Sequence, residues 1–212
     1  MSGDGRRWRD GERVKLYNIC EPEEAVLCSE FLRYDDKVLL AGAGLGWLSC
    51  WCALITGPEN LVCYEAQPYL AKLAKKAIAV NGQQLDIRPG VLGLADETVA
   101  FYICDAWAGS SVLGPRPETA TNVQGIDTNR ILREEKPTAL VLDIEGGEFA
   151  LIPGLEMPTV RLVILETHGD CVSVDKEAAM WECLTGQFRV ERVIRRESDA
   201  KMRFCVLSRE LP

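Results

Sequence analysis

The feature that most constrains the fold is a glycine-rich turn between two apolar segments, within residues 38–65. A short apolar run, Val38 to Ala41, leads into the turn Gly42-Ala43-Gly44-Leu45-Gly46. A second apolar segment, residues 47–56, follows the turn, and after a Gly-Pro break the chain continues as the β-rich segment 61–65. This order of strand, tight turn, helix, loop and strand predicts one βαβ unit of a parallel sheet.

The same unit predicts a nucleoside-containing cofactor. Glycines in the turn allow a ligand to approach the backbone at the helix N-terminus, where N–H groups lack partners within the helix. Glu65 lies at the carboxyl end of the second strand, where it can accept hydrogen bonds from both hydroxyls of a ribose. A turn that merely joins strand to helix is the alternative without a ligand.

The spacing of the glycines favours S-adenosylmethionine over a dinucleotide. A dinucleotide fingerprint reads G-x-G-x-x-G, and its third glycine permits close packing of helix on strand. Here the glycines are spaced G-x-G-x-G, and Trp47 stands where the third glycine is expected. An indole at this position obstructs that packing, so NAD is disfavoured.

Length and charge place further bounds on the protein. The chain length of 212 residues predicts a single domain, residues 21–212, and residues 1–20 are expected to be a loose N-terminal segment. The net charge of −8 argues against a general binder of nucleic acid or anionic membrane. The uncharged stretch 38–56 is long enough for a membrane span, but its glycines and the flanking strands favour a buried strand-turn-helix instead.

The cysteines and the N-terminus indicate a cytoplasmic protein. The nine cysteines are scattered and form no C-x-x-C pair, so neither a disulfide framework nor a zinc site is predicted. Residues 1–10 are polar and charged, which is not the pattern of a signal peptide.

The rest of the chain predicts an alternation of helices and strands. The expected helices are 21–34, 69–81, 127–134 and 177–184. The expected strands are 85–88, 90–94, 99–103, 139–143, 160–166, 188–195 and 203–207, with 90–94 and 99–103 arranged around a turn. Residues 105–122 are rich in Gly, Ser, Pro and Thr and are expected to form an active-site loop.

Two features of this alternation predict the architecture around the cofactor. The last two strands form an antiparallel hairpin, which is typical of the methyltransferase variant of the doubly wound sheet. The first helix is expected to pack beside strand 38–41 and to form part of the wall of the cofactor cleft.

Carboxylates and the single histidine follow two of the predicted strands. Asp143 ends strand 139–143, Glu145 and Glu148 follow it, and Glu166 and His168 come at the end of the next strand. Since ligands bind at the carboxyl ends of strands in an open α/β sheet, both groups are expected to face one cleft. There, His168 could take the proton from a substrate hydroxyl during methyl transfer.

Other interpretations of these residues stay open. The acids could orient His168, bind the ammonium of a methionine moiety, stabilise a sulfonium charge or hold a divalent cation. No metal site is predicted, because no His/Asp spacing specific to a metal is present. The acids could also simply begin a helix, and His168 could be a surface residue. Trp107 and Trp181 are candidates for a substrate pocket, although the pattern around Trp181 favours the core.

Four stretches of the sequence resemble the FkbM family of S-adenosylmethionine-dependent methyltransferases. They are VLLAGAGLGWLS, CYEAQPYLAKLAKKAIAVNG, ALVLDIEGGEFALIPG and VILETHG, in the order of the family's "D-x-G-A-x-x-G", "E-P-x-P", "D-x-E-G-x-E" and "E-x-H" motifs. The similarity extends from about Glu21 to the C-terminus. It implies a Rossmann-like class I methyltransferase fold, with a seven-stranded, mostly parallel sheet, and usually O-methylation of a hydroxyl on a small molecule, sugar or natural product.

The resemblance also implies roles for individual residues. The turn residues Gly42, Ala43, Gly44 and Gly46 would wrap the methionine end of the cofactor. Glu65 and the adjacent Ala66 would bind the ribose, and Gly93 and Leu94 would lie near the adenine. The acids and His168 would line the side where the methyl group is transferred. Two departures from the family motifs are Leu40, which replaces an acid at the end of the first strand, and Ala66-Gln67-Pro68, which replaces the usual continuation after Glu65.

Three functional hypotheses follow from the sequence. The first is an O-methyltransferase acting on a small molecule or glycan, with His168 or a nearby carboxylate as the base. The second is an N-methyltransferase acting on a peptide or amine. The third is a module that binds the cofactor without catalysis and serves a protein partner, which Leu40 would favour. Neither nucleic acid nor a membrane is an expected partner, and a homodimer is left open.

Overall fold

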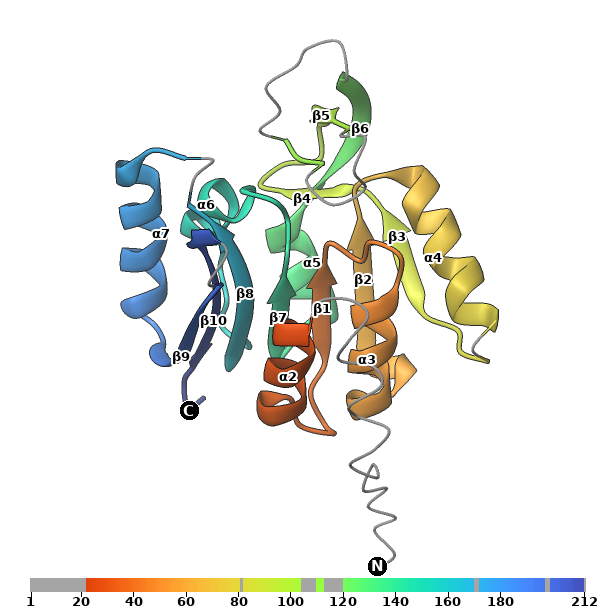
Figure 1. The fold of residues 1–212 in the computed structure, drawn as a ribbon, viewed down its shortest axis with the longest axis horizontal. Helices are drawn as coiled ribbons and strands as arrows, with labels where there is room; N and C mark the ends of the chain where they lie inside the picture. Colours follow the sequence, from red (N-terminus) through yellow and green to blue (C-terminus); the bar gives the residue numbers. More distant parts are fainter. Residues whose placement is uncertain are drawn as a thin grey trace, which may run out of the picture.

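The computed structural model describes residues 22–80, 82–103, 110–112, 120–169, 172–196 and 199–211. Its centre is a seven-stranded sheet with the order β3-β2-β1-β7-β8-β10-β9 (Figure 1). In that order the strands are β3 (Asp86–Pro89), β2 (Leu61–Glu65), β1 (Val38–Ala41), β7 (Ala139–Leu142), β8 (Leu162–His168), β10 (Asp199–Ser208) and β9 (Arg189–Arg196). The predicted N-terminal segment 1–20, Trp107 and most of the predicted loop 105–122 lie outside the described residues.

The topology confirms the predicted class of fold. Neighbouring strands pair in parallel along the order β3-β2-β1-β7-β8, and β10 is antiparallel to both β8 and β9. The chain adds β2 and β3 on one side of β1 and later adds β7 and β8 on the other side. The order of strands therefore reverses between β1 and β7, which is where ligands bind in open α/β sheets.

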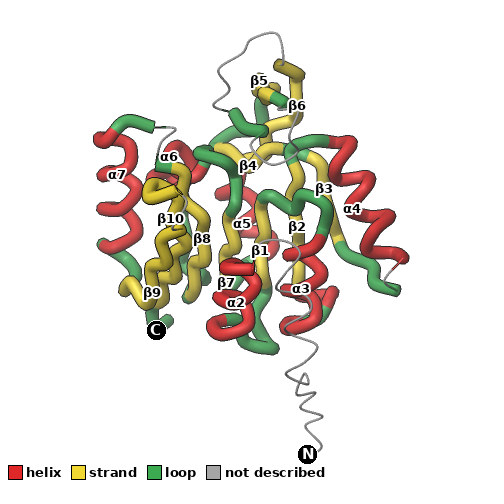
Figure 2. Tube along the Cα trace, viewed as in Figure 1, coloured by secondary structure: helices red, strands yellow, loops and turns green. Residues whose placement is uncertain are grey.

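Three helices cover each face of the sheet (Figure 2). On one face lie α2 (Pro22–Phe31), α3 (Trp47–Thr56) and α4 (Pro68–Val80). On the other face lie α5 (Thr128–Glu135), α6 (Glu148–Leu151) and α7 (Val174–Thr185). Two short 3₁₀ helices, η1 (Pro58–Asn60) and η3 (Ile152–Gly154), complete the helical elements of the part that the structure describes.

The central strands are apolar because both of their faces are buried. In β1, Leu40 packs with the α2–α3–α4 face while Leu39 packs with the α5–α6–α7 face. In β7, Val141 and Leu140 divide between the two faces in the same way. Since alternate side chains of a strand point to opposite sides, a strand between two helical layers needs an unbroken apolar run.

A small second sheet corrects one prediction from the sequence. Strands β4 (Val91–Gly93) and β5 (Thr98–Tyr102) do not pair with each other, and each pairs with β6 (Ala120–Asp127), β4 in parallel and β5 antiparallel. The start of β6, residues 120–122, falls within the segment 105–122 that is expected to be a loop from its content of Gly, Ser, Pro and Thr. Only Val123 and Gly125 of this strand are buried, so its apolar pattern is weak. This sheet projects from the carboxyl edge of the main sheet (Figure 1).

Helix α2 packs mainly against α3, β8 and β10. Its residues Ala25 and Leu27 also share one apolar cluster with Leu40 of β1, so it lies on the same face of the sheet as predicted. Trp51 of α3 fixes the contact between α2 and α3, because its Nε1–H donates to the carbonyl oxygen of Ala25 at 3.0 Å and to Oγ of Ser29 at 2.8 Å. Ile164 of β8 and Phe204 of β10 are part of the apolar surface that α2 covers.

The remaining observations on the fold agree with the sequence. The six described cysteines, Cys28, Cys50, Cys52, Cys63, Cys183 and Cys205, are free thiols. Trp181 is half-buried and packs against the core on the α7 side, as its pattern indicated. Among the described residues, no helix combines the length and the hydrophobicity that crossing a membrane requires.

We predict that Gly46→Ala destabilises the protein by ~2–4 kcal/mol. Gly46 has φ = +87°, and an added Cβ would lie 2.9 Å from Cδ1 of Ile78 and 3.2 Å from Cβ of Ala74, both on α4. Gly82→Ala is the matched control, because Gly82 has φ = +73° and no atom within 4 Å of the added Cβ. Urea unfolding of both variants would measure the difference. Equal losses of stability would show that backbone strain alone makes Gly46 necessary.

Candidate active site

A cavity of about 460 Å³ lies at the carboxyl edge of the main sheet. One wall is formed by the turn after β1 and by the end of β2, including Gly42, Gly44 and Glu65. The small sheet forms a second wall, and the segment after β7 forms the third with Asp143 and Glu145. A cavity of this size is in the range that holds a cofactor or drug-sized molecule.

The carboxylate of Glu65 holds the glycine turn in place. Glu65 is buried, and its Oε2 accepts a hydrogen bond from the backbone N–H of Gly44 at 2.7 Å. Its Oε1 accepts one from the backbone N–H of Gln67 at 2.9 Å. Each carboxylate oxygen has a second lone pair, so both oxygens can still accept a hydrogen bond from a ligand.

The protonation of Glu65 depends on two opposing effects. Burial raises the pKa of Glu65 above its ordinary value, because the ionised form loses solvation. The hydrogen bonds from Gln67, Gly44 and Ala66 lower the pKa and offset part of that increase. A ligand that donates two further hydrogen bonds would favour the ionised form again.

Gly42 is required by the close approach of two strands. It has φ = +87°, and a Cβ at this position would lie 1.7 Å from the carbonyl oxygen of Asp143. The backbone of β1 and that of the segment after β7 are therefore in contact at the floor of the cavity. Any side chain here would separate the two strand ends and displace Asp143.

The wall formed by the small sheet is mostly apolar. It includes Leu92, Phe101 and Val112, and Leu151 of α6 faces the same space. Gly93 leaves this space open, since a Cβ there would meet no atom within 4 Å. An apolar slot between a glycine and an aromatic side chain suits a flat heteroaromatic ring.

Ser111 connects this wall to the acidic segment after β7. Its backbone exchanges two hydrogen bonds with Tyr102 of β5, at 2.8 and 3.0 Å. Its Oγ donates to the carbonyl oxygen of Glu145 at 2.5 Å. Glu145 has φ = +53°, a conformation that non-glycine residues rarely adopt, so this contact helps to hold a strained residue in the wall.

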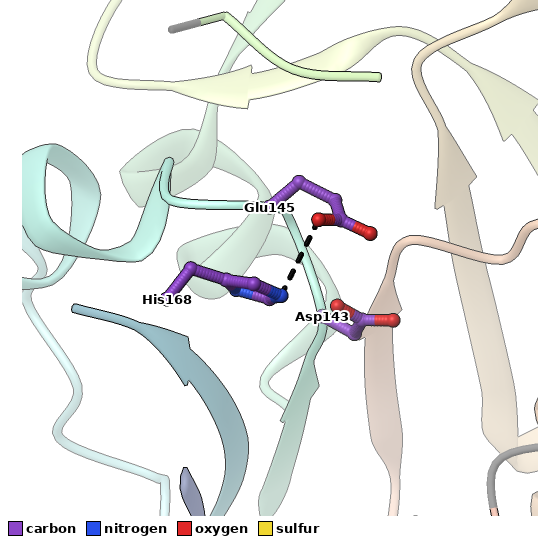
Figure 3. A group of neighbouring side chains, drawn as sticks. All are labelled: Asp143, Glu145 and His168. Atoms are coloured by element: carbon purple, nitrogen blue, oxygen red, sulfur yellow. Dashed lines mark ion pairs between the residues drawn. The ribbon is translucent and has the colours of Figure 1, made fainter. Parts of the chain in front are cut away.

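His168 does not line the cavity and contacts three carboxylates. Figure 3 shows its ion pair with Glu145. Its Nε2 is 3.3 Å from Oε2 of Glu145 and 3.8 Å from Oε1 of Glu166. Its Nδ1 is 3.5 Å from Oε1 of Glu148, whose side chain is completely buried. Glu148 is itself fixed by the backbone N–H groups of Gly146 and His168, each at 2.9 Å.

These carboxylates make His168 a cation at neutral pH. Burial lowers its pKa, but the interaction with Glu148 and the charges of Glu148, Glu145 and Asp143 outweigh burial and raise the pKa to about 9. A protonated imidazole cannot accept a proton from a substrate. In this environment His168 is suited to orienting and neutralising the carboxylates rather than to acting as a base.

A second group of acids extends below the cavity. Glu24 of α2 is buried, and its carboxylate lies with those of Asp143 and Glu166 so that one oxygen of each is within 4.8 Å of the others. Asp143, Glu145 and His168 form another such group. The group of Glu24, Asp143 and Glu166 offers only oxygen donors and could hold a divalent cation or compensate an organic cation. In the other group, a protonated His168 has no free lone pair for a metal ion.

The structure brings together most of the residues predicted from the sequence. The cavity is lined by eight of them: Gly42, Gly44, Glu65, Ala66, Gly93, Leu94, Asp143 and Glu145. Ala43 is buried in the core, Gly46 packs against α4, and His168 lies behind Glu145.

Several residues of the site were missed by the sequence analysis. Phe101, Ser111 and Val112 lie in or beside segments predicted as strand and loop, where nothing in the local sequence distinguishes them. Glu24 lies in the first turn of the predicted helix 21–34, where an acid is ordinary because it interacts favourably with the helix dipole, so nothing in the sequence singles it out.

The fold is similar to solved methyltransferase structures. An O-methyltransferase from Bacillus cereus in complex with SAH is 12% identical, with 97% of this chain and 94% of that chain covered and a TM-score of 0.55. A ribosomal protein L11 methylase from Lactobacillus delbrueckii subsp. bulgaricus is 14% identical, with 90% and 80% covered and a TM-score of 0.52.

A third similar structure is Streptococcus pneumoniae Sp1610 in complex with S-adenosyl-L-methionine. It is 13% identical, with 90% of this chain and 73% of that chain covered and a TM-score of 0.53. No protein-family model and no curated protein matches the sequence. At these identities the similarity establishes the fold: the chain has the Rossmann-like fold found in class I methyltransferases.

We predict that the wild-type protein is more stable than His168→Gln and that the difference in their free energies of unfolding depends on pH. The difference between a pKa of about 9 in the folded protein and about 6.5 in the unfolded chain corresponds to ~3 kcal/mol. Since the folded pKa is the higher one, this stabilisation is complete below pH 6.5 and is lost as the pH rises to about 9. Urea unfolding of both proteins between pH 6 and about 9.5 measures the gap. A gap that does not narrow would contradict the charged state of His168.

Proposed function

We propose that the protein is an S-adenosylmethionine-dependent methyltransferase that acts on a hydroxyl of a small molecule, sugar or natural product. The observation that carries the proposal is the cavity between the Gly42–Gly44 turn, Glu65 and Asp143, at the point where the strand order reverses. The fold, whose solved examples include complexes with SAH and with S-adenosyl-L-methionine, supports the same cofactor.

The residues of the cavity fit the parts of this cofactor. Glu65 would accept hydrogen bonds from the ribose hydroxyls, with Ala66 beside it. The apolar slot of Gly93, Leu94 and Phe101 would hold the adenine. The turn residues Gly42 and Gly44 would border the methionine end, and Asp143 would attract its ammonium group.

The acidic side of the cavity supports a methyl transfer assisted by a base. When bound, the cofactor supplies an electrophilic methyl group on a sulfonium. Glu145 lines the cavity and would take the proton from the acceptor hydroxyl as its oxygen bonds to the methyl carbon. The carbon–sulfur bond would break in the same step, with S-adenosylhomocysteine as the leaving group. His168, as an imidazolium, would hold Glu145 in position, and alignment of the reactants would supply much of the rate.

The same acids favour one alternative, the methylation of an amine. Asp143 lines the cavity, and the buried carboxylates of Glu24 and Glu166 lie close to it, so this group would attract a protonated amine. Glu145 would then accept the proton that the amine must lose before its lone pair can attack. An acceptor screen that includes both hydroxyl and amine compounds distinguishes the two reactions.

Membership of the FkbM family is a finer proposal that rests on the motifs of the sequence. Three of them fall where the geometry needs them: the glycine turn follows β1, Glu65 ends β2, and the segment Asp143 to Glu148 follows β7. Leu40, which replaces an acid of the family, is buried in β1. The buried Glu24 brings a carboxylate from α2 to the side of Asp143, and it would compensate for the missing charge.

We predict that the protein binds S-adenosylmethionine and S-adenosylhomocysteine with micromolar affinity and binds NAD much more weakly. Glu65→Ala should weaken binding of both sulfur nucleosides at least tenfold, since it removes the acceptor of two hydrogen bonds. Glu59→Ala, which alters an exposed glutamate after α3, is the control and should bind as wild type does. Isothermal titration calorimetry measures all three proteins, and an absence of binding by wild type would overturn the proposed function.

We predict that Glu145→Gln lowers the rate of methyl transfer at least 100-fold while S-adenosylhomocysteine binds within about threefold of wild type. The amide keeps the size of the side chain but cannot accept the proton. Glu182→Gln, on the exposed side of α7, is the control. Single-turnover rates with the acceptor found in the screen give the comparison. Transfer at the wild-type rate would assign the proton to another group.

A further inference from the structure

A second hollow lies at the opposite edge of the main sheet and contains four arginines. It has a volume of about 430 Å³ and is lined by Arg33, Arg161, Arg189, Ser208, Arg209 and Glu210. Arg33 follows α2, Arg161 precedes β8, and Arg209 follows β10. These positions are at the amino end of β8, whereas the candidate active site is at its carboxyl end (Figure 1).

Two of the guanidinium groups are fixed by the fold. Arg161 donates from Nε to Oδ1 of Asp36 at 2.9 Å and from Nη2 to the carbonyl oxygen of Phe31 at 3.2 Å. Arg209 donates from Nε to the carbonyl oxygen of Val160 at 2.8 Å and from Nη2 to that of Met157. The guanidinium of Arg209 also lies 4.6 Å from the centre of the Phe188 ring. The hollow therefore has preorganised walls.

The positive charges in this arginine hollow are only partly compensated. Arg161 pairs with Asp36, and Arg189 pairs with Glu191 at 2.7 Å. Within the described ranges, Arg209 donates only to uncharged acceptors, and burial lowers its pKa, as expected for a cation without a counter-charge. Arg33 forms no ion pair with any described residue, and Glu210 is the one acid that lines the hollow.

We propose that the arginine hollow binds a small oxyanion with two or more negative charges. Guanidinium groups match phosphate and carboxylate oxygens with paired N–H donors, and several of them converging on one space favour a multivalent anion. The chain has a net charge of −8 and therefore does not attract anions in general. Binding of an anion at these arginines would be a local property of the hollow. The site is separate from the proposed methyltransferase site and does not depend on that function.

The test is calorimetric titration of the whole chain with inorganic pyrophosphate, and with citrate as the carboxylate counterpart, in sodium chloride of matched ionic strength. We expect a Kd of about 1 mM or tighter for at least one of the two anions. The double variant Arg33→Ala/Arg189→Ala should weaken this binding at least tenfold. Both side chains are exposed, so the variant should fold as wild type does.

Arg195→Ala is the matched control. Arg195 is an exposed arginine of the same strand as Arg189, but it lies toward the other end of β9 and outside the hollow. Anion binding by this variant should equal that of wild type, and binding of S-adenosylhomocysteine should be the same in all variants. The proposal is overturned if neither anion binds, or if Arg195→Ala weakens binding as much as the double variant does.

Discussion

The contact between Gly42 and the carbonyl of Asp143 is the constraint on which the site depends. It joins the ends of β1 and β7, the two strands between which the order of the sheet reverses. The chain continues from β1 toward β2 and from β7 toward β8, which lie on opposite sides of this point, so the carboxyl edge of the sheet opens here. The glycine turn and the acidic segment are therefore opposite walls of one cavity. A side chain at position 42 would move both walls apart.

Electrostatics distinguish the two ends of the cavity. At the Glu65 end, each oxygen of one buried carboxylate accepts a hydrogen bond from a backbone N–H group. Each oxygen can still accept a second hydrogen bond from a ligand. At the Asp143 end, several carboxylates surround a single imidazolium, so this end has an excess of negative charge. Burying such an excess is costly unless a cation compensates it. The proposed cofactor, whose methionine end carries an ammonium and a sulfonium, would supply that compensation.

The sequence predicted the main sheet well and the small sheet poorly. Segments such as β1 and β7 are short unbroken apolar runs, and their length and the turn residues around them favour strands that are buried on both faces. In β6, Val123 supplies the only fully buried side chain, and its partners β4 and β5 are distant in sequence, so local pattern carries little information about the pairing. The wall formed by Phe101 and Ser111 could not be foreseen for the same reason.

The sequence by itself determined the class of fold, the glycine turn and the identity of the strand-end acids, because these depend on local spacing and on the period of apolar residues. Only the tertiary structure decided what those residues do. It buried His168 among Glu145, Glu148 and Glu166 and so made it a cation rather than a base. It brought Glu24 to Asp143 and grouped four arginines at the far edge. Charges and pKa values depend on neighbours that are distant along the chain, which no local pattern contains.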